Sequence, residues 1–167
     1  STITSIVLGT QFLDNHQFIL LADQLGNSSF IDCDGDKFFI TAKEVTATNS
    51  DVDIRDVKLE FDLGAPVGED RLLRTVNNVT TLVGETNTQV IHYYGMVTAT
   101  DLTVNVQGNV YDNVVEYSVR TWEEMENGPN IETTNTTYLF APEVSAISTS
   151  SISSLDSTVI FTAELVE

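Results

Sequence analysis

The sequence predicts an all-β protein, an antiparallel sandwich, meander or open barrel with at most one short helix. Two observations support this fold class. Val, Ile, Thr, Tyr and Phe, which suit a pleated sheet, recur in alternation through most of the 167-residue chain. Turn residues punctuate these runs at Asp34-Gly35, Gly64-Ala65-Pro66, Val83-Gly84-Glu85 and Asn127-Gly128-Pro129. With no long linker and no fixed-period repeat, we expect a single β-rich domain over residues 1–167.

Alternation places the expected strands in order along the chain. In the clearest pair, Leu102, Val104 and Val106 share one face, and a Gln-Gly-Asn turn then reverses the chain. Alternation resumes from residue 115 to residue 119, as expected for the second arm of a hairpin. The expected strands lie near residues 2–8, 17–22, 28–32, 37–47, 56–63, 71–83, 88–98, 101–107, 110–122, 131–140, 143–148 and 157–166.

Helical spacing is confined to one stretch. In QFLDNHQFILLADQLG, residues 11–26, apolar side chains recur at helix-like intervals and the run stops at Gly26, so one short helix is expected there at most. The charged stretch TWEEMENG, residues 121–128, is predicted to be a loop, with a turn of helix as the alternative. The Ser/Thr-rich residues 145–158 are predicted to form a loosely held connection or an edge strand.

The charge of the chain limits its partners. Asp and Glu number 25 against 7 Lys and Arg, for a formal net charge of −18. Nucleic acid is therefore not expected as a partner, because its phosphates require Lys and Arg, and an anionic membrane surface is disfavoured for the same reason. Dissolved salt or divalent cations would relieve the self-repulsion of the folded state, which favours a saline or calcium-rich extracellular setting. Solubility alone is the alternative reason for the acids.

Motifs of catalysis are absent from the sequence. His16 and His92 are far apart, and neither has a companion at ligand spacing. There is no H-E-x-x-H, G-x-S-x-G or Gly-Lys-Ser/Thr motif. Cys33, the only cysteine, lies between two aspartates, whose charge raises a thiol pKa and weakens it as a nucleophile. No run of apolar residues is long enough to span a membrane. We therefore expect a non-enzymatic protein without a membrane span.

The stretch FIDCDGDKFFITAKE, residues 30–44, suggests a metal site. Its three aspartates alternate on a short turn, and alternating carboxylates can converge on Ca²⁺, which takes six to eight oxygen ligands. An EF-hand loop then needs a glycine where this chain has Lys37, and Glu44 arrives one position late. Phe38 and Phe39 are typical of a strand, so we interpret the stretch as a hairpin whose tip collects calcium. The predicted calcium ligands are Asp32, Asp34, Asp36 and Glu44.

Other features point to ligands more weakly. Aromatic residues at strand positions could form a platform for a small molecule or a glycan, although core packing is the usual role at such positions. Sequons for N-glycosylation occur at Asn27, Asn78 and Asn135 and would matter in a secreted chain. A second acidic run over residues 51–56 is expected to be a solvated loop. The aromatic residues in question are Tyr93, Tyr94, Tyr111, Tyr117, Tyr138 and Trp122.

Both ends of the chain have strand-like sequences, TITSIVLG and STVIFTAELVE. Terminal strands usually pair inside their own sheet. In assembling surface proteins, a terminal strand instead completes the sheet of a neighbour, with affinity supplied by backbone hydrogen bonds. A homo-oligomer or larger assembly, such as a filament, is therefore among the expectations.

From about residue 96 to residue 167 the chain resembles a β-meander module of bacterial secreted proteins and lipoproteins. The resemblance rests on the segments DLTVNVQGNVYDNVVEYSVRT, TTNTTYLFAPEVSAI and TAELVE. Members of that family usually follow the Ala-Pro pair with Gly-Val-Gly, and this chain departs from the pattern after Pro142. The resemblance implies an exported, non-enzymatic sheet protein, and it carries over no catalytic residues.

These observations favour a structural protein of the cell exterior or cell surface. It would be stabilised by calcium near residues 32–44 and would assemble with itself through a terminal strand. A bacteriophage virion protein, in a capsid decoration or a tail, is one alternative, since acidic β-meanders also occur there. A small-molecule or glycan binding module is the other.

Overall fold

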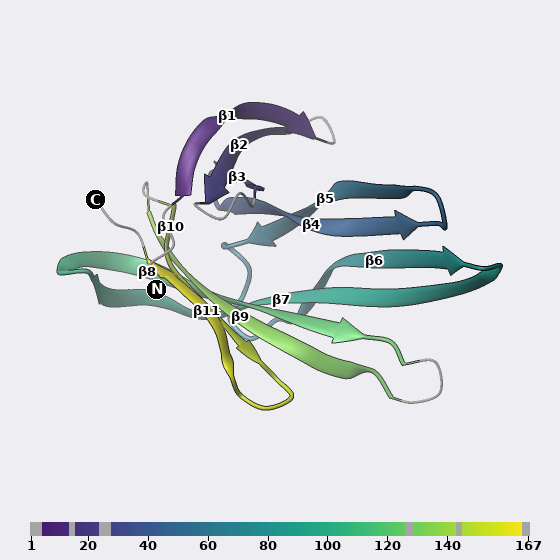
Figure 1. Ribbon diagram of the computed structural model, residues 1–167. Helices are drawn as coiled ribbons and strands as arrows, with labels where there is room; N and C mark the ends of the chain where they lie inside the picture. Colours follow the sequence, from purple (N-terminus) through teal and green to yellow (C-terminus); the bar gives the residue numbers. More distant parts are fainter. Residues whose placement is uncertain (1–4, 14–15, 24–27, 126–128, 143–144, 165–167) are drawn as a thin grey trace.

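The computed structural model describes residues 5–13, 16–23, 28–125, 129–142 and 145–164, and their regular elements are all strands (Figure 1). The all-β prediction is confirmed. The described residues contain no helix that could cross a membrane. The strands are β1 (Ser5–Leu13), β2 (His16–Asp23), β3 (Ser28–Asp34), β4 (Lys37–Ala47), β5 (Val52–Asp62), β6 (Arg71–Leu82), β7 (Glu85–Val106), β8 (Asn109–Glu123), β9 (Ile131–Ala141), β10 (Ser145–Ser153) and β11 (Val159–Glu164).

The strands form one 11-stranded sheet in the order β1-β2-β3-β4-β6-β7-β8-β9-β10-β11, and β5 pairs with the other edge of β4. Every pairing is antiparallel except a short parallel contact that pairs Thr46 with Val79 and Ala47 with Thr80. The sheet is therefore antiparallel apart from this one contact, which makes it formally mixed, and it does not close into a barrel. The β4–β5 hairpin lies across from β6–β9, so the sheet forms two facing layers (Figure 1).

The main core fills the space between these layers. Phe61 from β5 stacks on Tyr117 from β8, with ring centroids 4.9 Å apart, and the Phe38 and Phe140 rings lie 4.6 Å apart. Full burial of one such side chain stabilises the fold by about 1.5–3 kcal/mol, so these rings are the main attachment between layers. The buried members of this cluster are Phe38, Ala42, Val57, Leu59, Phe61, Ala65, Val76, Val97, Tyr117, Val119 and Phe140.

Gly95 makes room for Tyr117 in this core. A Cβ atom at Gly95 would lie 2.8 Å from Cε1 of Tyr117 and 2.8 Å from Cδ1 of Leu73, and closer still to the tyrosine hydroxyl. Real Cβ atoms essentially never approach other atoms so closely. A glycine in the middle of β7 therefore allows the ring of Tyr117 to lie flat against the strand.

A second, smaller cluster lies on the opposite face of β4. Phe39 and Phe30 both meet Phe18 edge to face, with centroids 6.5 Å and 6.3 Å away. Phe38 points into the main core, and neighbouring residues of a strand point to opposite faces, so Phe39 points away from that core. The strands β1–β3 curl over this face of the hairpin, as the arch at the top of Figure 1 shows.

Side chains replace ladder hydrogen bonds where β4 and β6 separate. The Oδ1 atom of Asn78 accepts a hydrogen bond from the Val45 amide at 2.9 Å. At the far tip, Asn49 Oδ1 accepts a hydrogen bond from the Val83 amide, also at 2.9 Å. These two asparagines hold the layers together beyond the short parallel contact.

Three expectations about strands need correction. The short helix allowed for residues 11–26 is not formed in the described residues there: β1 and β2 make a hairpin, and the strand expected over 17–22 lies within β2; residues 14–15 and 24–27 lie outside the described residues. The expected strands 88–98 and 101–107 are one strand, β7, which bulges near Asp101, where φ is +56°. The Ser/Thr-rich segment is neither a loose connection nor an edge, since β10 pairs with both β9 and β11.

These corrections share one physical cause. Phe18 is buried while Phe12 is exposed, so the apolar residues of 11–26 serve the two faces of a hairpin and not one helical stripe. In β10 the hydroxyls have partners: Thr136 donates to Ser151 at 2.9 Å, and Ser151 is buried. Packing against neighbouring strands overrides local spacing in both places.

Candidate functional site

The aspartate-rich stretch forms a tight hairpin between β3 and β4. Asp34 pairs with Lys37 across a two-residue turn, Gly35-Asp36, in which Gly35 has φ +59°. A glycine with positive φ at the first central position is typical of a type II′ turn, which suits the twist of hairpin strands. The hairpin interpretation is confirmed, with a turn tighter than an EF-hand loop.

The structure separates the four predicted calcium ligands. Asp32 and Asp34 share a face of β3, because they pair with Phe39 and Lys37, and Asp36 lies in the turn itself. Glu44 lies on the opposite face of β4, since the β4–β5 ladder runs without a bulge and Glu44 is five residues from Phe39. Glu44 bonds to Arg55 instead, at 3.4 Å. Among the described residues no group of three or more His, Cys, Asp or Glu could hold a metal ion. Calcium binding stays a prediction.

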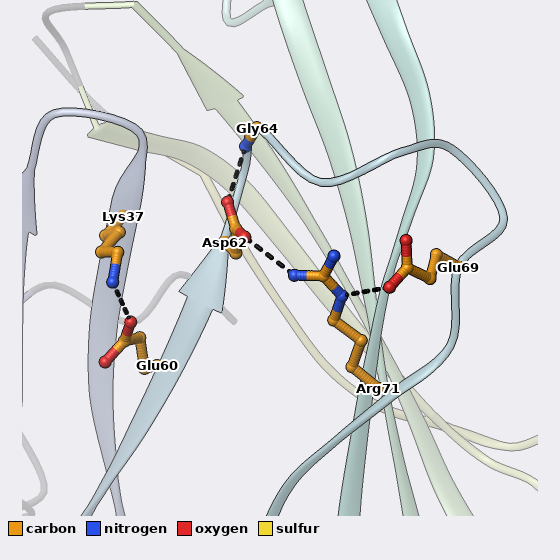
Figure 2. A network of polar contacts seen from close by, with 6 residues as sticks. All are labelled: Lys37, Glu60, Asp62, Gly64, Glu69 and Arg71. Atoms are coloured by element: carbon orange, nitrogen blue, oxygen red, sulfur yellow. Dashed lines mark hydrogen bonds and ion pairs between the residues drawn. The ribbon is translucent and has the colours of Figure 1, made fainter.

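Ion pairs surround the turn (Figure 2). Lys37 pairs with Glu60 on β5, and this hydrogen bond raises the pKa of Lys37 and lowers the pKa of Glu60. Arg71 at the start of β6 bonds to Asp62 and to Glu69, each at 2.8 Å. All these groups are partly exposed, so water screens each pair and the pairs orient the turn more than they stabilise it.

The same turn is fixed to the core. The Leu63 amide donates to the Asp36 carbonyl at 2.7 Å, and the Gly64 amide donates to Oδ1 of Asp62 at 3.2 Å. The Tyr117 hydroxyl reaches the backbone of Asp62 from the other layer. Burial, followed by the charge of Asp62, raises the pKa of Tyr117 to about 12. The hairpin tip, the β5–β6 connection and the core are therefore one connected unit.

A second ion-pair junction lies on the β6–β9 layer. Arg120 bonds to Asp70 just before β6 and lies 3.8 Å from Glu132 on β9. Arg120 is also the only basic residue after Arg74 in the sequence. The few cations of the chain thus join segments that are distant in sequence, and they leave the acidic surface largely uncompensated.

The aromatic residues divide between two faces. Tyr117 belongs to the main core, with Tyr138 and Tyr93 packed against or within it, and burial raises the pKa of all three hydroxyls. Tyr94 and Trp122 lie on the other face, where Trp122 pairs with His92. Tyr94 and Trp122 thus share a face of the β7–β8 pair outside the main core, whereas Tyr111 packs against a small separate cluster that includes Val106 and Val114.

His92 and the asparagines of two sequons form hydrogen bonds with neighbouring strands. His92 contacts Thr75 at 2.9 Å through Nδ1 and Glu124 at 2.7 Å through Nε2. Asn78 bridges β4 and β6, and Asn135 accepts a hydrogen bond from Ser118 at 2.8 Å. Both contacts use the Oδ1 atom of the asparagine, whereas an N-linked glycan would be attached to Nδ2. The third sequon, Asn27, lies outside the described residues.

Edge strands are the other candidate surface of this protein. In the described part of the chain β1 pairs only with β2, β11 only with β10, and β5 only with β4. Exposed large apolar side chains lie on all three strands: Leu8 and Phe12 on β1, Val52 and Ile54 on β5, Val159 and Ile160 on β11. Alternation alone marked both ends as strands, but it could not tell which edges stay open.

Comparison with protein-family models, curated proteins and solved structures found no match to this chain. The resemblance of residues 96–167 to bacterial surface modules stays a prediction for that reason.

Proposed function

We propose that this protein is a non-enzymatic structural protein of the cell exterior that assembles with copies of itself. The observation that carries the proposal is that β1 and β11, at the two ends of one sheet, each have an open edge among the residues that the structure describes. An open edge presents unpaired backbone N–H and C=O groups and is a ready template for another strand. Here the exposed apolar side chains of the same strands add to that tendency.

The acidic charge makes this assembly depend on salt concentration. Copies with a net charge of −18 repel one another. At 0.1 M ionic strength, salt largely screens this repulsion between charges more than about 10 Å apart. We expect monomers at low salt and larger species as NaCl rises, which fits an extracellular or saline setting. A virion surface is the alternative setting.

The test is the mass of the purified chain by light scattering after size exclusion, together with negative-stain images, across protein and NaCl concentration. Growth of the mass with both variables is the expected result. A monomer at millimolar protein in molar NaCl, with and without calcium, would rule out self-assembly.

Stabilisation by calcium at the turn is the finer part of the proposal. It is supported by the excess of acids at the hairpin tip, where Asp36 and Asp62 both lie near Gly64 and the cations Lys37 and Arg71 are also paired with Glu60 and Glu69. A ligand that binds only the folded chain raises its melting temperature with concentration. The experiment titrates Ca²⁺ into the wild type, Asp34→Ala and the matched control Glu85→Ala, an exposed acid at the start of β7. Equal shifts in all three proteins would assign the effect to general screening.

A binding module is the second candidate, favoured by the placement of Tyr94 and Trp122 away from the core. Aromatic faces of this kind stack on sugars and other flat ligands. Trp122 is the only tryptophan, so its fluorescence reports directly on this surface. Saturable quenching by a glycan, lost in Tyr94→Ala, is the result expected of this candidate; no change across a glycan panel rejects it.

A further inference from the structure

We infer that assembly occurs through β1 and β11 and not through β5, and that the partner at these edges is a second copy of this chain. This inference rests on the proposed function and names the surface that it uses. All three strands are open along one side in the described residues, so pairing alone does not distinguish them. Their side chains do.

The β5 edge is protected by charge. Its sequence VDIRDVKLEFD carries acidic and basic residues over nearly its whole length, and both basic residues, Arg55 and Lys58, bond to carboxylates on β4 or β5. Charged side chains on an edge strand oppose the approach of another strand, because each would lose water or meet a like charge. The open edge of β5 is therefore a poor template for another strand.

The two end strands lack this protection. The β1 sequence SIVLGTQFL has no charged residue and no proline, and the β11 sequence VIFTAE has only Glu164 at its end. Phe12 is 70 % exposed and Val159 is 60 % exposed. In a chain of net charge −18, these are the strands where another acidic molecule can approach with the least repulsion.

The same charge pattern indicates what covers these edges. A basic partner would be recognised through acidic side chains, and β1 offers none. An uncharged strand of similar apolar content is the fitting complement. Such strands stand at both ends of this sheet, so a second copy supplies the complement and each added copy leaves a new open edge.

The test places the same negative charge on each edge in turn. Phe12→Glu on β1 and Val159→Glu on β11 should each raise the protein concentration needed for assembly at least tenfold. Val52→Glu on β5 is the matched control, because Val52 is an apolar edge residue of 59 % exposure, and it should leave that concentration unchanged. Circular dichroism melting of each variant confirms that it is folded before its mass is measured.

Disulfide cross-linking gives a second measurement without added charge. Single cysteines are introduced into the Cys33→Ser variant, which lacks the native thiol. Thr10→Cys protein mixed with Thr162→Cys protein should form disulfide-linked dimers on oxidation, whereas Asp53→Cys on β5 should not. The two proposals fail differently. If the wild type never assembles, the proposed function fails; if it assembles but Val52→Glu or Asp53→Cys gives the larger effect, only the choice of edges is overturned.

Discussion

Replacing Gly95 with alanine tests whether the contact between β7 and Tyr117 holds the two layers in register. The new methyl group would meet Tyr117 and Leu73 at 2.8 Å or less, and the Tyr117 ring has no room to move because it is fully buried. Overpacking of this kind costs about 1–3 kcal/mol. Replacing glycine by alanine also restricts the unfolded chain, which returns about 0.4–1 kcal/mol. We expect a net loss of about 1–2 kcal/mol in the free energy of unfolding.

The assay is urea unfolding followed by the fluorescence of Trp122, with thermal melting as a second probe. For a chain of this size a loss of about 1–2 kcal/mol lowers the melting temperature by about 2–8 °C. Gly64→Ala is the matched control, because a Cβ atom there meets its nearest neighbours at an ordinary 3.6 Å. We expect that variant to remain within about 0.5 kcal/mol of the wild type.

A double-mutant cycle identifies the atom responsible. Tyr117→Phe removes the hydroxyl that crowds the new methyl group, although it also removes the contact with the Asp62 backbone. The two changes together should therefore cost less than the sum of their separate effects. Equal stability of Gly95→Ala and Gly64→Ala would refute the packing argument, and strict additivity would refute the assignment to the hydroxyl.

The remaining predictions concern pH, backbone strain and the layer contact. Folding raises the pKa of Tyr117 from 10 to about 12, and that of Tyr138 in the same direction, so this contribution to stability is complete below pH 10 and falls as pH rises toward 12. The part of the phenolate absorbance that Tyr117→Phe removes should therefore appear together with loss of circular dichroism, and its appearance in folded protein would contradict this. Val83 has φ +51° in a tight turn and is 92 % exposed, so Val83→Asn should stabilise the chain by about 1 kcal/mol in urea unfolding, and a loss of stability would count against strain there. Asn78→Ala leaves a partly buried β4 amide without its acceptor and should cost about 1–3 kcal/mol, whereas Asn77→Ala, an exposed neighbour, should cost little in the same assay.

Sequence patterns predicted individual strands well where alternation was long. The strand expected over residues 37–47 has those bounds in the structure, and the one expected over 131–140 ends a single residue later. The hairpin at Asp34-Gly35 was also predictable, because a glycine turn between alternating runs is a local signal. Such signals depend only on residues a few positions apart.

The candidate site was less predictable for a physical reason. The spacing from Asp32 to Glu44 suggests one calcium loop, but in a strand each residue changes face, and Glu44 falls on the face opposite Asp32 and Asp34. The partners around the turn, Glu60 and Arg71, come from β5 and β6, and no local pattern connects them to residue 37.

Local chemistry thus decided the fold class, the positions of most strands, the tight turns and the acidic surface, because each depends on neighbouring residues or on composition. Tertiary structure decided the rest. It placed the β4–β5 hairpin over β6–β9, turned the segment before Asp23 into a hairpin, and buried Tyr117 against Gly95. It also decided which edges stay open, since whether a strand has one neighbour or two depends on pairing between segments far apart in the chain.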